Sequence, residues 1–310
     1  MKKLLLVGAS LNCGAPGKIA EQIGLLAIRN GWDVYMAHGY RHSNPSQLKT
    51  LPMVTPWEEK VHAIYSLFDR HGLGPDGKTK ELVEWIKINK PDLIHLHNIH
   101  GYFLNYQTLF EYINTTDIPV IWTLHDCWPF TGHCAYFDSI DCEKWQTKCE
   151  HCELKRDYPK SIFVDNSKQN YVLKKQLFTR LHRCIMVPVS DWLGKITKQS
   201  FMGKYPINVI HNGIDLNIFK PLQSDLKERL HISSNKIVVL GVAAPWVPRK
   251  GYIDMIKLSK DETFQVVMVG VSEKQQKQLP QNIISVTRTS NQHSPYEEPK
   301  AQRLQAQRFY

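Results

Sequence analysis

The chain has 310 residues, of which 42% are hydrophobic and 22% are charged. This composition supports at least one sizeable core and, at roughly 100–200 residues per domain, favours two domains; it excludes a disordered tail, a collagen and a disulfide-stapled mini-protein. Lysine and arginine number 39 against 29 aspartates and glutamates, so the net charge of +10 favours an anionic partner, such as a phosphorylated ligand, a membrane surface or a nucleic acid.

The first residues contain no membrane-crossing or secretory segment. The apolar run 4–9, which follows Lys2 and Lys3, is far shorter than the roughly 20 residues that cross a bilayer, and it lacks the cleavage pattern of a signal peptide. We therefore expect a cytoplasmic protein whose seven cysteines are reduced thiols or metal ligands rather than disulfides.

Residues 3–37 have the pattern of a βαβ unit. The unalternating apolar run 3–8 predicts a strand buried on both faces of a parallel sheet. A loop with Gly14 and Gly17 follows, then a helix that ends at Asn30, and then a second strand. Because the helix N-terminus after such a loop suits an anion, the two glycines are candidates for phosphate binding. The alternative is that they only let the chain turn tightly.

Polar side chains follow two further apolar strands. After loops and short helices over 40–75 and a helix over 81–89, the runs 92–97 and 118–124 predict strands. Ligands usually bind at the carboxyl ends of strands in open α/β sheets, so we expect the polar residues at these ends to face one crevice. These residues are His97, Asn98, His100, His125 and Asp126. The alternative for any single histidine is a structural role with satisfied hydrogen bonds.

Residues 127–165 form a cysteine-rich insertion in place of the expected helix. Its thiols belong to Cys134, Cys142, Cys149 and Cys152. In a reducing compartment, this set resembles a four-thiolate structural zinc site, with His133 and His151 as substitute ligands. Buried free thiols are the equal alternative, and disulfides are the third. Neither zinc nor free thiols would imply a catalytic role, because a closed four-ligand site leaves no position for substrate.

The helical pattern over 166–184 combines an apolar row with a basic opposite face. The basic residues are Lys168, Lys174, Lys175, Arg180 and Arg183. We expect the apolar row to pack on the core and the basic face to be solvated. A sharper interpretation, compatible with the first, is that the basic face meets anionic lipid headgroups.

The rest of the chain predicts the end of one domain and part of another. Strands over 184–190 and 205–210 flank a helix over 191–200, and the turn at Asn212 and Gly213 is the expected hinge. A second doubly wound unit follows, and its expected elements are strands over 236–243, 264–270 and 282–286 and a helix over 252–259. We therefore expect an α/β protein with an N-terminal domain over 1–213, a partial C-terminal domain over 214–290 and an irregular tail over 291–310.

Several motifs in this order resemble one enzyme family. They are Gly17–Gly24, Pro91–Asn98, Thr123–Cys134, Val189–Leu193, Ile210–Asp215 with Phe219, and Arg249–Gly251. Together they resemble GT-B glycosyltransferases of family 4, and among these the bacterial capsule and exopolysaccharide enzymes of colanic-acid type. The resemblance implies two Rossmann-like domains facing a cleft. The second is expected to be truncated, because nothing after Val286 matches the family's E-x7-E motif.

The resemblance also implies an activity and a set of site residues. The implied activity is a retaining transfer of a sugar from a nucleotide-diphosphate-sugar to a lipid-linked glycan acceptor during cell-surface polysaccharide synthesis, with no metal required. The donor diphosphate would be bound by Lys250, Arg249, Gly14 and Gly17. The implied catalytic residues are His125 and Asp126, and those of the acceptor side are His97, Asn98 and His100.

Two other classes of function compete with the enzyme. The first is a non-catalytic remnant that binds the acceptor or a partner protein. The second is a nucleic-acid-binding protein, which we do not expect because the basic residues form no motif interleaved with aromatic side chains. For the enzyme, we expect a cytoplasmic location with peripheral contact to the anionic inner face of the membrane.

Overall fold

The computed structural model describes residues 1–287 apart from 41, 218, 222 and 224. By internal contacts, the chain divides into two compact units, Met1–Gly213 and Ile214–Tyr310. Within the described residues, no helix has both the length and the apolar character needed to span a bilayer. The tail expected over 291–310 lies outside the described residues.

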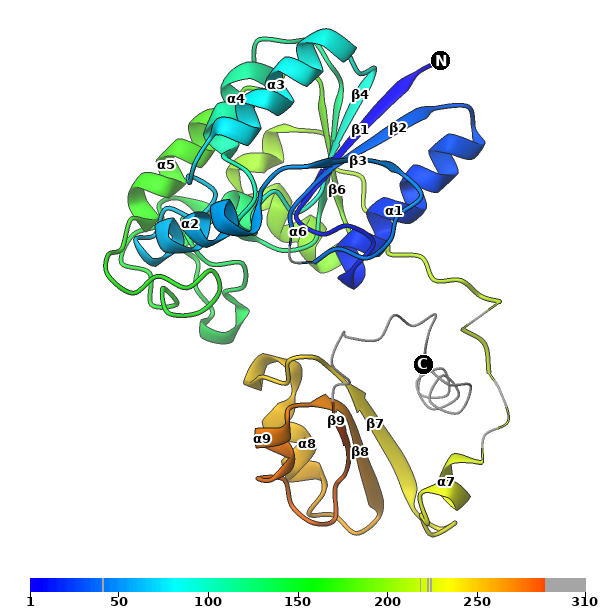
Figure 1. The fold of residues 1–310 in the computed structure, drawn as a ribbon. Helices are drawn as coiled ribbons and strands as arrows, with labels where there is room; N and C mark the ends of the chain where they lie inside the picture. The colour runs from blue at the N-terminus through cyan, green and yellow to red at the C-terminus, as the bar shows by residue number, and fades with distance from the viewer. Residues whose placement is uncertain (41, 218, 222, 224, 288–310) are drawn as a thin grey trace. The chain divides into compact units, whose positions relative to one another are not determined.

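The first unit is built on a six-stranded, fully parallel sheet (Figure 1). Its strands are β1 (Lys3–Gly8), β2 (Asp33–His38), β3 (Lys49–Pro52), β4 (Leu93–Leu96), β5 (Val120–Leu124) and β6 (Cys184–Pro188). Their order in the sheet is β3-β2-β1-β4-β5-β6. The chain therefore winds outward from β1 in one direction and then from β4 in the other, which is the doubly wound order expected from the sequence.

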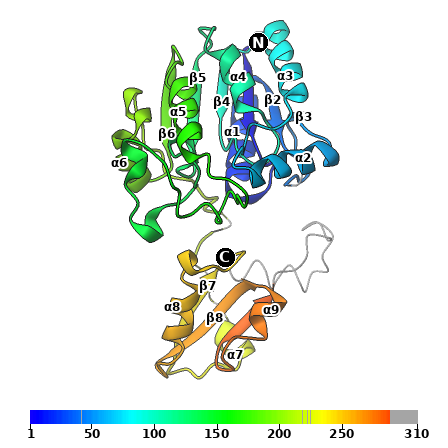
Figure 2. The same cartoon turned by 90° about the vertical axis from the view of Figure 1, so that its left-hand side faces the viewer.

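Helices cover both faces of this sheet (Figures 1 and 2). They are α1 (Gly14–Arg29), α2 (Pro56–Leu67), α3 (Gly77–Asn89), α4 (Tyr106–Ile113), α5 (Ser167–Phe178) and α6 (Asp191–Gln199). Side chains of β1 alternate between two cores: Leu4 and Leu6 pack in the cluster that includes α1, whereas Leu5 and Val7 pack in the larger cluster that includes α3, α4 and α5. Burial on both faces explains why positions 4–7 of the strand are all apolar.

The boundaries differ from the sequence-based expectation at several places. Helix α1 begins at Gly14 rather than after Gly17, and the segment expected as loops and short helices holds the edge strand β3 as well as α2. The strand expected over 205–210 is reduced to a single bridge between Ile207 and Met186 of β6, although the N–H groups of Asn208 and Ile210 also donate to the carbonyls of Met186 and Pro188. Pro188 has no N–H to donate back, which interrupts a regular ladder at this point.

Lys174 is the clearest departure from the expected solvated face of α5. Its side chain is fully buried, and its Nζ donates to the carbonyl oxygens of Trp128 at 2.8 Å and Thr131 at 3.1 Å. The ammonium also lies 3.4 Å from the centroid of the Trp128 ring. Burial lowers the pKa of Lys174 to about 7. The expectation that Lys174 is solvated was wrong, because the insertion folds back over this part of the helix.

The second unit contains a three-stranded parallel sheet in the order β7-β8-β9. Its elements are α7 (Leu226–Arg229), β7 (Ile237–Val242), α8 (Tyr252–Leu258), β8 (Phe264–Val271), α9 (Glu273–Gln276) and β9 (Ile284–Thr287). Trp246, Val266, Met268, Val271 and Ile283 form its buried core. The three strands expected from the sequence are present, with ends shifted by a few residues.

Candidate functional site

The loop between β1 and α1 lies at the point where the strand order of the first sheet reverses. The N–H of Ala9 donates to the carbonyl of Asn98 at 2.9 Å, which ties this loop to the residues after β4. A small pocket there is lined by Gly8, Ala9, Ser10, Pro16, Gly17, Ala20, Met36, His97 and Asn98. A Cβ on Gly17 would lie 2.9 Å from the Cβ of Ser10, so only glycine permits this close approach. Gly14 does not line the pocket.

Three histidines from β4 and the end of β5 stack beside this pocket. The rings of His95 and His97 have centroids 4.4 Å apart, and those of His97 and His125 are 5.5 Å apart with an interplanar angle of 21°. Nδ1 of His97 and Nε2 of His125 are 3.1 Å apart and share a hydrogen bond. Nε2 of His95 lies 2.8 Å from the hydroxyl of Thr123. The structure therefore brings His97 and His125 into direct contact, as expected for residues at adjacent strand ends.

Burial keeps this histidine stack neutral. Loss of solvation lowers the pKa of His95 and His125 to about 4 and holds that of His97 well below its usual value. At neutral pH, one ring of the His97–His125 pair donates and the other accepts. His97 keeps a buried Nε2 without a hydrogen-bond partner. A neutral imidazole of this kind can orient or donate to a ligand hydroxyl, but it is a weak base.

Asp126 is a buried carboxylate whose oxygens are both engaged. Its Oδ2 lies 2.9 Å from Nε2 of His100 and accepts from the amide of Asn98 at 3.4 Å, while Oδ1 accepts from the N–H of Trp128 at 3.0 Å. Burial alone would raise the pKa of Asp126, but the interactions with His100 and with the Trp128 N–H lower it below its ordinary value. The carboxylate is therefore ionised and fixed in place.

The insertion contributes a residue to this network that the sequence did not indicate. The phenol oxygen of Tyr158 lies 2.9 Å from Nδ1 of His100, whose other nitrogen contacts Asp126. Burial raises the pKa of the Tyr158 phenol, so it is neutral. A carboxylate, an imidazole and a phenol thus form one chain. No spacing rule links Tyr158 to His100 across 58 residues, and only the fold brings them together.

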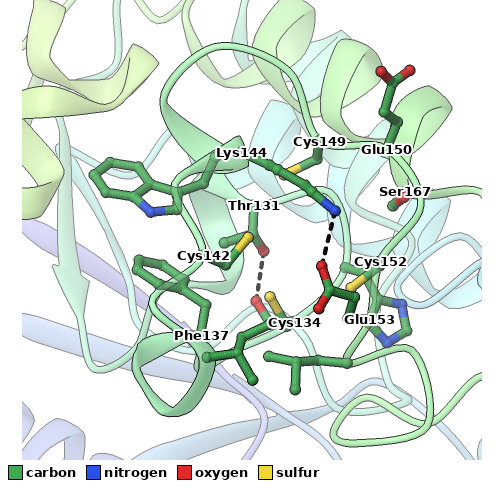
Figure 3. A pocket seen from close by; sticks show the side chains of 14 residues that line it. Thr131, Cys134, Phe137, Cys142, Lys144, Cys149, Glu150, Cys152, Glu153 and Ser167 are labelled. Carbon is green, nitrogen blue, oxygen red and sulfur yellow. Dashed lines mark hydrogen bonds and ion pairs between the residues drawn. The ribbon is translucent and has the colours of Figure 1, made fainter.

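The four cysteines of the insertion line a single pocket (Figure 3). All four are free thiols, and a hydrogen bond from Cys134 is the main cause that lowers the pKa of Cys152. Across the described part of the chain, no group of three or more His, Cys, Asp or Glu side chains is arranged to hold a metal ion. The zinc site expected at Cys134, Cys142, Cys149 and Cys152 is therefore not supported.

Arg249 and Lys250 lie in the second unit, directly before α8. They end a one-turn 3-10 helix, Pro248–Lys250, and are both exposed. Gly251 follows with a φ of +76°, a left-handed conformation that glycine adopts at little cost. Partial burial and the Arg249 guanidinium lower the pKa of Lys250. The turn thus presents two consecutive cationic side chains at one place on the surface of this unit.

Comparison with known proteins identifies the family. The model of Glycosyltransferase Family 4 matches residues 27–218, which include the histidine stack, Asp126 and the insertion. The chain belongs to this family. It is also 29% identical over 220 residues to WcaC of Escherichia coli (strain K12), named as a colanic acid biosynthesis glycosyl transferase. That alignment covers 66% of this chain and 52% of WcaC, so the chain spans about half the length of the curated relative it matches.

Solved structures show the same fold. A sucrose-phosphate synthase from Thermosynechococcus elongatus matches with a TM-score of 0.59 at 14% identity, covering 93% of this chain and 71% of that one. A glycosyltransferase from Rickettsia africae matches with a TM-score of 0.51 at 14% identity, covering 94% and 69%. The GT-B fold class expected for this Glycosyltransferase Family 4 chain is confirmed.

The buried neutral histidines predict a loss of stability in acid. His62, His95 and His125 each have a pKa of about 4 in the folded chain, against an ordinary 6.5. Between these values the unfolded chain binds more protons, so the free energy of unfolding should fall as the pH falls from about 6.5 towards 4, by about 1 kcal/mol per group for each pH unit. Urea denaturation at a series of pH values measures this slope. A flat profile over this range would contradict the assignment of neutral buried histidines.

Proposed function

We propose that this chain is a retaining glycosyltransferase that moves a sugar from a nucleotide-diphosphate-sugar to a lipid-linked glycan acceptor in cell-surface polysaccharide synthesis. The observation that carries the proposal is the pair of fixed polar groups at the carboxyl ends of β4 and β5, the neutral His97–His125 pair and the ionised Asp126, in a chain of Glycosyltransferase Family 4. Similarity to WcaC supports the polysaccharide context.

In this proposal, His125 contacts the reacting sugar and Asp126 holds the neighbouring groups of the site in place. The neutral imidazole of His125 hydrogen-bonds a hydroxyl of the donor sugar. This hydrogen bond strengthens as positive charge develops at the anomeric carbon, so it stabilises the transition state more than the bound substrate. Asp126 accepts from His100, Asn98 and the N–H of Trp128, so its oxygens are committed to positioning. A carboxylate held in this way is a poor nucleophile, which supports same-face attack by the acceptor rather than a covalent intermediate.

Two elements, the turn with Arg249 and Lys250 and the β1–α1 loop, are assigned to the donor diphosphate. Lys250 and Arg249 supply cationic groups that neutralise the charge growing on the departing nucleoside diphosphate, and this requires no metal. Gly17, which lets the β1–α1 loop pack closely, and Gly14, at the first position of α1, are assigned to backbone contacts with phosphate oxygens. His97, Asn98 and His100 are assigned to the acceptor side.

Replacing Lys250 with alanine tests the diphosphate assignment. One charge-assisted hydrogen bond to phosphate contributes enough that we expect affinity for a nucleoside diphosphate to fall about 10- to 100-fold. Thermal unfolding of the full chain in the presence of UDP, GDP, ADP or dTDP measures this. The matched control is Lys257→Ala, another exposed lysine of the same unit, which should leave binding unchanged. Equal binding by Lys250→Ala and the parent chain would remove Lys250 from the site.

Sugar transfer is measured separately from binding. The full chain is incubated with a panel of nucleotide sugars and a membrane lipid extract, and released nucleoside diphosphate and glycosylated lipid are both quantified. Both products are expected, and they should appear in equal amounts. Thermal stabilisation by a nucleotide sugar without either product would overturn the enzyme and favour the non-catalytic alternative, a module that binds the acceptor or a partner.

A further inference from the structure

Helix α2 presents an apolar stripe to solvent. Trp57, Ile64 and Phe68 lie at helical spacings of seven and four residues, which places them on one face of the helix and its C-cap. Their side chains are 70%, 52% and 44% exposed. The opposite face of the helix is buried through Glu59, His62 and Ser66. The polarity of α2 is therefore inverted relative to an ordinary surface helix, which packs its apolar stripe on the core.

The insertion extends this stripe into a wider surface. The N–H groups of Ile162 and Phe163 both donate to the carbonyl of Leu67, at 3.0 Å and 3.1 Å, which anchors the segment beside the end of α2 (Figure 1). The ring of Phe163 stacks on that of Phe68 with centroids 4.8 Å apart. We call the whole set the apolar surface. Its members are Trp57, Ile64, Phe68, Ile162, Phe163 and Val164, all exposed.

Cationic side chains accompany the apolar surface. Lys60 lies on the same exposed face of α2, between Trp57 and Ile64, while Arg70 and Lys160 are exposed next to Phe68 and Ile162 along the chain. Among the described residues, none of these three cations forms an ion pair, whereas Lys144, Lys148 and Lys168 pair with glutamates of the insertion. Asp157 is the exposed acid on this part of the insertion.

We propose that the apolar surface is the face by which this protein docks on an anionic lipid bilayer. Its aromatic and aliphatic side chains enter the boundary between headgroups and acyl chains, while Lys60, Arg70 and Lys160 meet lipid phosphates. Exposed apolar side chains, accompanied by three cations that form no ion pair within the described part of the chain, match both the acyl and the phosphate layers of an anionic lipid surface. The inference rests on the proposed function in one respect: an enzyme that acts on a lipid-linked acceptor must reach a bilayer surface.

Helix α5, the membrane-facing element suggested by charge pattern, fits a bilayer less well. Its Lys174 is buried, and Lys168 lies 3.9 Å from the carboxylate of Glu150. Val172 is the exposed large apolar residue that the helix offers. A bilayer contact through α5 would therefore offer basic side chains but almost no apolar side chains to insert among the lipids. The apolar surface offers both.

Co-sedimentation of the full chain with vesicles tests the proposal. Vesicles contain phosphatidylcholine with about one third phosphatidylglycerol, and pure phosphatidylcholine vesicles serve as the neutral reference. We expect the chain to bind the anionic vesicles, and Ile64→Ser with Phe163→Ser to weaken binding at least 10-fold. Lys60→Glu and Lys160→Glu should each weaken it about fivefold or more on anionic vesicles. These side chains are exposed, so thermal unfolding should match that of the parent chain.

The control is Ile88→Ser, which alters an isoleucine of α3 that is 78% exposed and lies outside the apolar surface. It should bind vesicles as the parent chain does. Equal binding by Ile64→Ser/Phe163→Ser and the parent would overturn the proposal, as would loss of binding only in Lys175→Glu/Arg180→Glu on α5. Concentration-dependent dimerisation that the serine variants abolish, without vesicle binding, would assign the surface to a second copy of the chain instead. Because vesicle binding needs no sugar transfer, its failure is distinguishable from failure of the proposed function.

Discussion

Replacing Asp69 with alanine is expected to lower the free energy of unfolding by about 3–5 kcal/mol. The carboxylate is 1% exposed; Oδ1 lies 2.5 Å from Nδ1 of His133, and Oδ2 accepts from the N–H of Asn166 at 2.6 Å. Asp69 thereby joins the end of α2, the insertion and the start of α5. Truncation leaves the buried imidazole of His133 and the partly buried N–H of Asn166 without these partners, which costs more than loss of the contacts themselves.

The chain offers a matched control for this substitution. Asp117 and His182 also form a pair, at 3.0 Å, but both side chains are more than half exposed. Asp117→Ala should therefore leave stability unchanged within error, because water replaces the lost partner. Seven of the eight tryptophans lie in residues 1–213, so tryptophan fluorescence during urea denaturation reports on this unit. If Asp69→Ala costs no more than Asp117→Ala, the buried network does not stabilise the insertion.

The elements that follow from local pattern were predictable from the sequence. The apolar runs at β1, β4 and β5 indicate strands buried on both faces, and parallel strands place the residues after their ends at one edge of the sheet. His97 and His125 follow two of these adjacent strands, and their ring nitrogens lie 3.1 Å apart in the structure. Their placement at this edge depends only on sequence position and on a general rule of sheet topology.

The features that depend on the insertion were not predictable in this way. Lys174 has the spacing of a solvated basic face, yet the carbonyls of Trp128 and Thr131, more than 40 residues away, bind its ammonium inside the protein. Tyr158 likewise reaches His100 only because the insertion folds back on the sheet. Cysteine spacing along the chain predicted a zinc site, but spacing alone does not fix how side chains are arranged around an ion, and the described residues hold no such group.

Replacing His125 with alanine is expected to lower the rate of sugar transfer about 10²–10³-fold, with a small change in donor affinity. The side chain donates or accepts through a neutral imidazole, since its pKa is about 4. The loss should therefore be the same at every pH between about 6 and 8, where His125 does not titrate. His125→Gln, which keeps a neutral hydrogen-bonding group, should recover part of the rate.

Steady-state kinetics of nucleoside diphosphate release measures both variants. His182→Ala is the control, because His182 is an exposed histidine of the same unit that pairs with Asp117. It should retain the parental rate. A parental rate in His125→Ala would exclude His125 from the reaction centre, and a loss confined to affinity for the donor would reassign it to ground-state binding.

The contact between His97 and His125 adds a test of how the first histidine acts. If His97 only fixes the ring of His125 through the Nδ1–Nε2 hydrogen bond, His97→Phe keeps the stacked shape but releases His125 and slows transfer. The same substitution in the His125→Ala background should then cost almost nothing, so the two effects are not additive. Additive effects would instead mean that His97 contacts the acceptor by itself. The double-mutant cycle thus separates a positioning residue from the acceptor-side role that family resemblance implies for His97.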